Sequence, residues 1–127
     1  SPDIRVALDL NQAWADQFGS ALITGVTVAR REVLEAQPEA IARFLTDYEA
    51  SIHYVNDNVA EAAALIGEFD IFNAQVAEKA LPFCNIAFVK GGEMQAMLMP
   101  FYQMLFDQDA ATTGGSLPDE GFYHLTD

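Results

Sequence analysis

Apolar residues recur along the chain in more than one spacing, and each spacing predicts its own kind of element. From Pro38 onward they follow the 3, 1, 3, 4, 3 spacing of one helix face, which predicts a long amphipathic helix over residues 38–56. That face comprises Ile41, Phe44, Leu45, Tyr48, Ile52 and Val55. We expect the first five of these side chains to be buried.

Polar residues with capping chemistry precede several other apolar segments. Asp9 or Asn11 can cap a short helix that runs through Gln17 and stops at Gly19, because their side-chain oxygens accept first-turn amides. Residues 30–37 predict a turn of helix that leads into Pro38.

Two asparagines predict the starts of the next helices. Asn58 with Glu61 three residues later resembles a capping box for a helix through Phe69. Asn73 can cap a helix over residues 74–81, which Pro82 should end because proline clashes with the preceding turn.

The last helical pattern contains four methionines. Gly91-Gly92 predicts a turn, and the apolar positions from Met94 to Leu105 lie on one helix face. Pro100 should kink or divide this helix. Met94, Met97, Met99 and Met104 could form a soft-metal or partner surface, but their helical spacing favours core packing.

Three segments predict short strands: residues 4–8, 21–29 and 85–90. In the first, Ile4, Val6 and Leu8 alternate with other residues. The second is rich in β-branched residues and has no charge, which predicts a largely buried strand. Gly25 interrupts it, for a bend, a bulge, a close approach of backbone or ligand, or a packing reason. The pattern as a whole predicts a mainly helical chain with two or three short strands.

Charge excludes some partners. The 127 residues carry 19 acidic and 6 basic side chains, a formal charge of −13 that nucleic acids and anionic membrane surfaces would repel. No apolar run approaches the roughly 20 residues needed to cross a bilayer, and no secretion signal is recognisable. The single cysteine, Cys84, excludes an internal disulfide.

Catalytic and metal-binding patterns are weak. His53 and His124 have no flanking motif, which favours surface or boundary histidines over a hydrolase triad. The pairs Glu32 with Glu35 and Asp107 with Asp109 lack the spacing of a cation loop. Cys84 has apolar neighbours typical of a small core residue. We therefore expect no catalytic residue, no metal site and no cofactor.

Residues 24–45 combine a β-rich segment ending in two arginines with a helix that starts at Pro38-Glu39. This stretch resembles the C-terminal part of the substrate-binding proteins of ABC importers and looks most like their nitrate, sulfonate, taurine and thiamine-precursor branch. The similarity continues in order through residues 48–58, 61–65, 80–86, 114–119 and the pair Phe122-Tyr123.

The resemblance implies the α/β, two-lobed fold of type II periplasmic-binding proteins, whose lobes close over a solute. Residues 1–20 would be the end of the second lobe and the hinge region, and residues 21–127 the C-terminal part of the first lobe. The chain would then be a C-terminal fragment that lacks most of the cleft wall. Thr24 and Gly25 would be cleft-facing, ligand-binding positions.

The same resemblance implies a function outside the cytoplasm, in the periplasm or on a membrane-anchored lipoprotein. The partners would be a small-molecule solute and an ABC permease, and no enzymatic step is needed. Two alternatives remain open: an enzyme of thiamine-pyrimidine synthesis with the same fold, or a helical protein-interaction domain. Because a lone strand leaves its edges open, we also expect the fragment to self-associate, most simply as a two-fold dimer.

Overall fold

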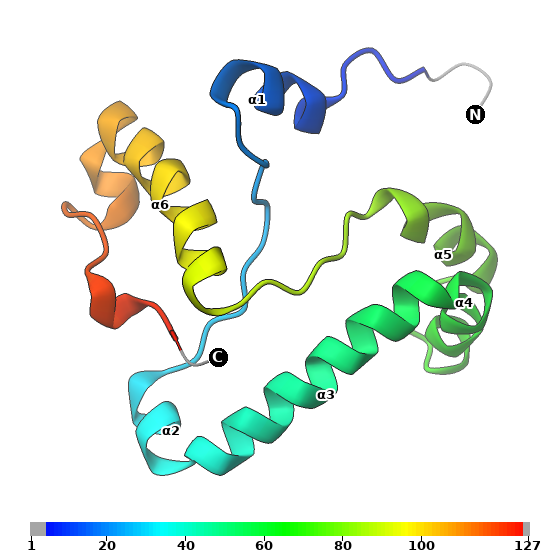
Figure 1. The fold of residues 1–127 in the computed structure, drawn as a ribbon. Coiled ribbons are helices and arrows are strands. Elements are labelled where there is room, and N and C mark those ends of the chain that lie inside the picture. Colours follow the sequence, from blue (N-terminus) through cyan, green and yellow to red (C-terminus); the bar gives the residue numbers. More distant parts are fainter. Residues whose placement is uncertain (1–4, 126–127) are drawn as a thin grey trace. The chain divides into compact units, whose positions relative to one another are not determined.

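A computed structural model describes residues 5–125, which are mainly helical (Figure 1). Within that range no strand or β-bridge is formed. The chain divides into two compact units: one combines the residues up to Thr27 with those from Val89 on, and the other is Val28–Phe88.

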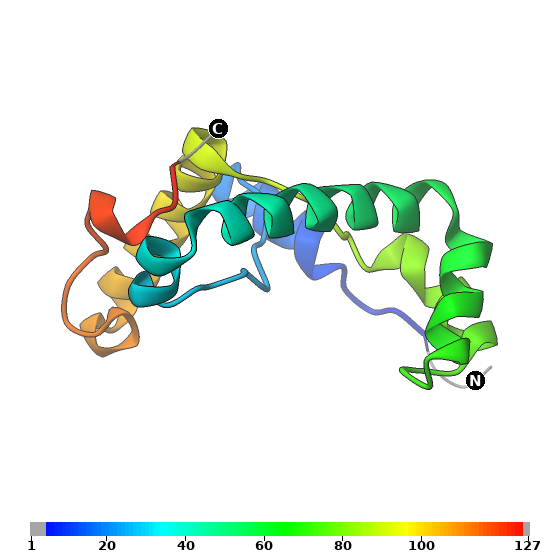
Figure 2. The ribbon, with the colours of Figure 1, turned by 90° about the horizontal axis from the view of Figure 1, so that it is seen from below.

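The second unit is organised by α3 (Pro38–Asp57), which Figure 2 shows as one continuous helix. Pro38 occupies its first turn, where the missing N–H leaves no helical hydrogen bond unmade. The preceding α2 (Arg31–Ala36) is a short helix, as predicted. The long helix expected over residues 38–56 is therefore confirmed.

The burial expected along α3 is only partly confirmed. Ile52 is buried, at 6% exposed, and Ile41 and Leu45 are half-buried. Phe44 and Tyr48 are exposed, so their predicted burial is wrong. Their rings stack on each other with centroids 5.4 Å apart, and this mutual contact removes only part of their surface from water.

The next helix, α4 (Val59–Glu68), begins directly after Asn58. The predicted capping box is wrong, because the Asn58 side chain accepts no bond from the new helix. Its Nδ2 instead donates to the Tyr54 carbonyl at 3.1 Å. With one residue between the helices, this amide closes the end of α3 rather than the start of α4.

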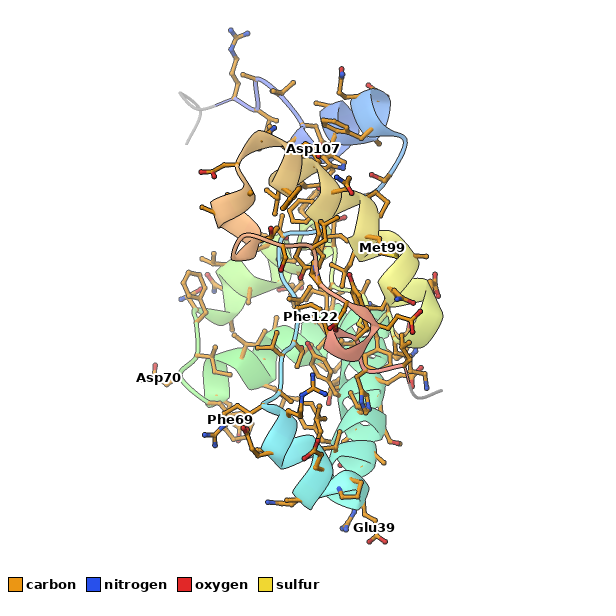
Figure 3. All side chains as sticks on the ribbon, turned by 90° about the vertical axis from the view of Figure 1, so that its left-hand side faces the viewer. Glu39, Phe69, Asp70, Met99, Asp107 and Phe122 are labelled. Atoms are coloured by element: carbon orange, nitrogen blue, oxygen red, sulfur yellow. The ribbon has the colours of Figure 1, made fainter. Side chains whose placement is uncertain are left out.

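A tight turn joins α4 to α5 (Ala74–Ala80). The Ile71 amide donates to the Ile66 carbonyl at 3.0 Å and the Asp70 amide to the Gly67 carbonyl at 3.1 Å, the two bonds of a Schellman motif. Asp70 takes the left-handed position of that motif, with φ 54°. Figure 3 shows its side chain directed away from the ribbon.

The start and end of α5 agree with the sequence. Asn73 Oδ1 accepts from the Val76 amide at 3.1 Å, which confirms the predicted cap. Pro82 lies in the 3-10 turn η1 (Leu81–Phe83) that follows the helix. Beyond this turn, Asn56 Nδ2 donates to the Ile86 carbonyl at 3.0 Å and ties the following segment to α3.

The first unit contains α1 (Leu10–Phe18) and α6 (Gly91–Gln108). Of the two candidate caps, Asp9 is used: its Oδ1 accepts from the Asn11 and Gln12 amides at 2.9 and 3.2 Å. Gly19 ends α1 with φ 66°, as predicted. α6 is not divided at Pro100, and it starts at Gly91, so the turn predicted at Gly91-Gly92 is wrong.

Aromatic rings link the elements of this unit. Trp14 meets Phe18 and Phe101 at centroid distances of 4.4 and 5.6 Å. Tyr102 meets Phe122, in the turn η3 (Glu120–Phe122), at 5.8 Å. The turn η2 (Ala110–Thr113) lies between α6 and η3 in the chain. It is capped by Asp109 Oδ1, which accepts from the Ala111 amide at 2.9 Å. The core packing expected of the four methionines is only partly confirmed: Met94, Met97 and Met104 are half-buried, but Met99 is exposed.

The three predicted strands are wrong for the residues that the structure describes. Ile4 lies outside those residues, and Val6 and Leu8 are exposed on an unpaired chain. Residues 21–29 and 85–90 also have no regular secondary structure. A strand requires a neighbour for its alternating N–H and C=O groups, and residues 5–125 supply none in a ladder.

We expect Gly67→Ala to destabilise the α4–α5 turn. A Cβ at Gly67 would lie 2.8 Å from the Ala74 Cβ, closer than packed carbons allow, so backbone must shift at a cost of about 1–3 kcal/mol. Urea denaturation followed by circular dichroism measures the change. Gly92→Ala is the matched control, because its Cβ meets nothing within 4 Å and alanine favours the helix. Equal stability of both variants would contradict the contact.

We expect Asp70→Gly to stabilise the same turn by up to about 1 kcal/mol, because glycine adopts the left-handed conformation without the strain of a Cβ. Asp70→Ala should have the opposite sign, since alanine keeps the strain and loses a residue type tolerated there. Thermal unfolding of the three chains measures the order. A lower melting temperature for the glycine variant would refute this geometry.

Candidate functional site: an apolar groove on the second unit

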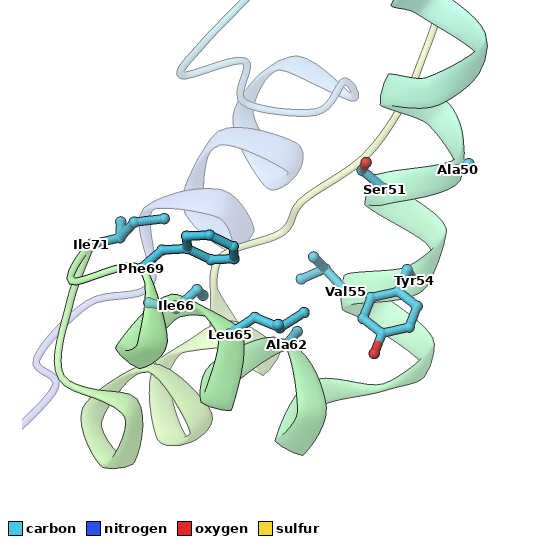
Figure 4. Close-up of a pocket in the computed structure, with 9 residues that line it drawn as sticks. All are labelled: Ala50, Ser51, Tyr54, Val55, Ala62, Leu65, Ile66, Phe69 and Ile71. Atoms are coloured by element: carbon cyan, nitrogen blue, oxygen red, sulfur yellow. The ribbon is translucent and has the colours of Figure 1, made fainter.

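The second unit carries an open groove of about 480 Å³ between the C-terminal half of α3 and α4 (Figure 4). We call it the α3–α4 groove. It is lined by Ala50, Ser51, Tyr54, Val55, Ala62, Leu65, Ile66, Phe69 and Ile71. Small residues on both helices, Ala50 and Ala62, leave the space that larger neighbours enclose.

The Schellman turn shapes one end of the groove. It brings Ile71 back toward Ile66, the pair of positions whose apolar contact commonly accompanies this motif. Figure 4 shows Phe69 and Ile71 at this end and Tyr54 and Val55 on the opposite side. Phe69 is 71% exposed, so a large apolar ring stands open to solvent beside the groove.

The chemistry of the groove is that of an apolar binding surface. No lining residue is charged, and the only polar side-chain groups are the hydroxyls of Ser51 and Tyr54. A site for an anionic solute needs convergent donors or cations, which these residues do not provide. The groove can bury apolar groups with one or two hydrogen bonds at its rim.

Sequence reasoning found half of this groove. The helix that carries Leu65, Ile66 and Phe69 was predicted, whereas of the α3 residues in the groove only Val55 belongs to the predicted apolar face. No apolar periodicity in the sequence includes Ala50, Ser51 and Tyr54. Only the sharp α3–α4 connection at Asn58 places these residues opposite α4.

Thr24 and Gly25, the ligand-binding positions implied by the resemblance, are exposed in the extended segment before α2. They do not belong to the groove. A Cβ built on Gly25 would meet nothing within 4 Å, so no packing contact in this chain requires glycine there. That Gly25 permits the close approach of a group outside the chain stays a prediction.

The candidate catalytic and metal-binding residues are not assembled into a site. His53 Nε2 lies 4.0 Å from Glu49 Oε1 on the exposed surface of α3, a geometry of little energetic value. Among residues 5–125 no three His, Cys, Asp or Glu side chains converge to hold a metal ion. Asp109 serves as a cap, and Asp107 accepts from Gln103 Nε2 at 2.8 Å.

Cys84 differs from its expected core position. Its side chain is exposed, which makes that prediction wrong, and its thiol contacts the Ala80 carbonyl at 3.4 Å. The 3-10 turn at Pro82 carries the chain out of α5 before Cys84 can reach the interior. The one titratable group with a shifted pKa is Tyr123 among the described residues: burial raises its pKa, with a contribution from Tyr102.

No protein-family model, curated protein or solved structure matches this chain. In the described part of the chain, no helix is both long and apolar enough to cross a membrane. The likeness to importer proteins therefore depends on the sequence motifs alone, and it enters below as a proposal.

We expect Phe69→Asp to weaken binding of a neutral, solvent-sensitive apolar dye to the groove by about tenfold, because a carboxylate must then be desolvated beside the dye. Fluorescence titration measures the affinity. Phe83→Asp is the control: Phe83 is more exposed, at 81%, belongs to the same unit and does not line the groove. If both variants bound the dye equally well, the groove would not be the binding surface.

Proposed function

We propose that this chain is the C-terminal part of the solute-binding component of an ABC importer. In this proposal the complete protein has the two-lobed α/β fold of the type II periplasmic-binding proteins. It acts outside the cytoplasm, encloses a small solute by closing about a hinge and delivers it to a membrane permease. The reaction cycle needs no catalytic residue and no cofactor in this component.

The observation that carries the proposal is an unfinished hydrophobic core. A compact monomer of 13.9 kDa exposes about 6,700 Å², and two separate compact halves together expose about 8,000 Å². This chain exposes 9835 Å². The excess over two compact halves supports a larger protein in which further polypeptide covers part of this apolar surface.

The identity of the uncovered residues supports the same proposal. The exposed large apolar side chains include aromatic residues of both units, and the buried set among the described residues contains only three larger than alanine or glycine. These three are Ile52, Leu98 and Tyr123. The motif order over residues 24–123 then suggests which polypeptide completes the core: the preceding part of an importer's binding protein.

The α3–α4 groove favours one of the alternatives, a helical protein-interaction domain. An uncharged groove beside an exposed phenylalanine fits the apolar face of a partner helix. The two proposals differ in what completes the core. A separate protein would cover the groove in the second case, whereas the same polypeptide covers it in the first.

We expect the full-length protein from the reading frame that contains this sequence to bind a small anion, a sulfonate or a thiamine precursor. In that protein Thr24→Val should weaken solute binding by about 3- to 10-fold, the loss of one hydrogen bond. Thr46→Val is the matched control, since the Thr46 hydroxyl donates to the Ala42 carbonyl of its own helix at 3.0 Å. Calorimetry measures both affinities.

The isolated chain supplies the complementary measurement. It should bind none of these solutes at sub-micromolar concentration, because most of the cleft wall is absent in this proposal. A reading frame without neighbouring permease and ATPase genes, together with a full-length protein that binds no such solute, would overturn the importer function. Unchanged affinity in Thr24→Val alone would remove Thr24 from the site.

A further inference from the structure

Charges of one sign border the uncharged α3–α4 groove. Between Arg43 and Lys79 the sequence contains seven Asp and Glu residues and no Lys or Arg. Five of these carboxylates lie next to lining residues of the groove, and all five side chains are exposed. We call them the acidic rim, and they are Asp47, Asp57, Glu61, Glu68 and Asp70. Within residues 5–125 no ion pair joins any of them to a basic side chain.

Helix geometry places part of the acidic rim along α3. Asp47 precedes Ala50 by three residues and Ser51 by four, so it lies on the groove side of α3, one turn before them. Asp57 follows Tyr54 by three residues and lies one turn beyond it. A carboxylate therefore stands at each end of the α3 wall.

The rest of the acidic rim borders α4 and the turn after it. Glu61 lies four residues before Leu65, and Glu68 lies three residues after it, so both flank this lining residue. Asp70 stands in the chain between Phe69 and Ile71, which both line the groove. The acidic rim thus follows both walls of the groove, and all of it belongs to the second unit.

The lining of the groove favours a helix over an extended segment as its occupant. Both walls are helices, and the ridges and grooves of their side chains can pack with those of a third helix. An extended segment would bury backbone N–H and C=O groups, for which the lining side chains offer only the hydroxyls of Ser51 and Tyr54. A helix satisfies these backbone groups within itself. The groove therefore fits the apolar face of a helix.

The acidic rim determines which charges that helix can carry. A helix whose apolar face lies in the groove brings the residues on either side of this face next to the acidic rim. Lys or Arg at these positions would meet carboxylates, whereas Asp or Glu would meet like charges. The charge of −13 on the whole chain attracts a cationic segment from a distance, and the acidic rim gives this attraction a place on the surface.

We propose that the α3–α4 groove binds a cationic amphipathic helix of a partner protein. The apolar face of that helix fills the groove, and its Lys or Arg side chains pair with the acidic rim. The proposal rests on the interaction-domain alternative given above and not on the importer function. Its test uses peptides and the isolated chain, so its result is separate from that of the solute titration.

Two synthetic peptides test the selection by charge. Each has about 18 residues, or five turns of helix, with leucines on one face. The positions beside the leucines are lysine in one peptide and glutamine in the other. We expect the lysine peptide to bind the chain at least about tenfold more tightly, because only lysine pairs with the acidic rim. Added salt should reduce the difference, since exposed ion pairs are screened. Fluorescence anisotropy of the labelled peptides measures both affinities.

Two alanine variants of α3 locate the binding surface. Ala50→Lys brings a cation into the groove and should weaken binding of the lysine peptide at least about tenfold. Ala42→Lys makes the same change at an exposed alanine of the same helix that does not line the groove, and it should change the affinity less than about threefold. Circular dichroism checks that both variants keep their helicity.

Two double variants with the same net charge test the acidic rim. Glu61→Gln with Glu68→Gln should weaken the lysine peptide by about three- to tenfold and leave the glutamine peptide unchanged. Glu32→Gln with Glu35→Gln is the matched control, because both residues are exposed on α2 and neither belongs to the acidic rim. It should change the affinity less than about twofold.

Tighter binding of the lysine peptide, lost in Ala50→Lys and weakened by the two α4 substitutions only, supports the proposal. Equal affinity for the two peptides would overturn it. Equal losses within either pair of variants would also overturn it, because the attraction would then be a diffuse effect of the chain's charge. A dimer of the chain that Ala50→Lys dissociates would assign the groove to a second copy and refute the partner helix.

Discussion

A β-rich segment is stable as a strand only when a neighbouring strand accepts and donates its hydrogen bonds. Residues 21–29 have the composition of a buried strand but lack this neighbour in the part of the chain that the structure describes. The exposed Val26 and Val28 and the absence of a sheet in residues 5–125 agree with the lack of a neighbouring strand. Helices form without such a neighbour because their backbone hydrogen bonds lie within the helix.

This difference explains how much the sequence could predict. The existence of the helices over residues 31–36, 38–57 and 74–80 followed from local information: a proline at a first turn, an amphipathic spacing and an asparagine cap. Strand formation is not local. The β-branched residues of 21–29 favour a strand in a half-buried sheet. Whether a sheet forms depends on other parts of the fold.

Capping shows the same division at the level of single side chains. Asp9 and Asn73 each follow residues that lie outside any helix, so their oxygens can face the next helix, and both cap as predicted. Asn58 is the only residue between two helices, so its amide meets the carbonyl end of α3 first. Asn58 with Glu61 correctly predicts a helix boundary, but the hydrogen bonds of the Asn58 side chain depend on how tightly the chain turns.

The candidate site was harder to predict because it combines residues that no single pattern unites. Phe69 and Leu65 lie on a helix that the sequence predicts, whereas Ala50 and Tyr54 lie outside the predicted apolar face of α3. Thr24 and Gly25 were drawn from motif similarity, and the structure leaves them exposed on the extended segment. No residue therefore serves both the groove and the implied solute site.

Two expected partners of residues 21–29 compete for one segment. In a longer importer protein, a neighbouring strand of the same polypeptide would pair with these residues, whereas the self-association expected from the sequence would need a second copy of the chain. An intramolecular partner has the advantage of a high effective concentration, whereas a second copy must overcome both dilution and the repulsion between two chains of charge −13. Self-pairing and completion of a lobe would both satisfy the backbone hydrogen bonds of residues 21–29. Which of the two occurs depends on whether the same polypeptide contains a strand that can pair with them.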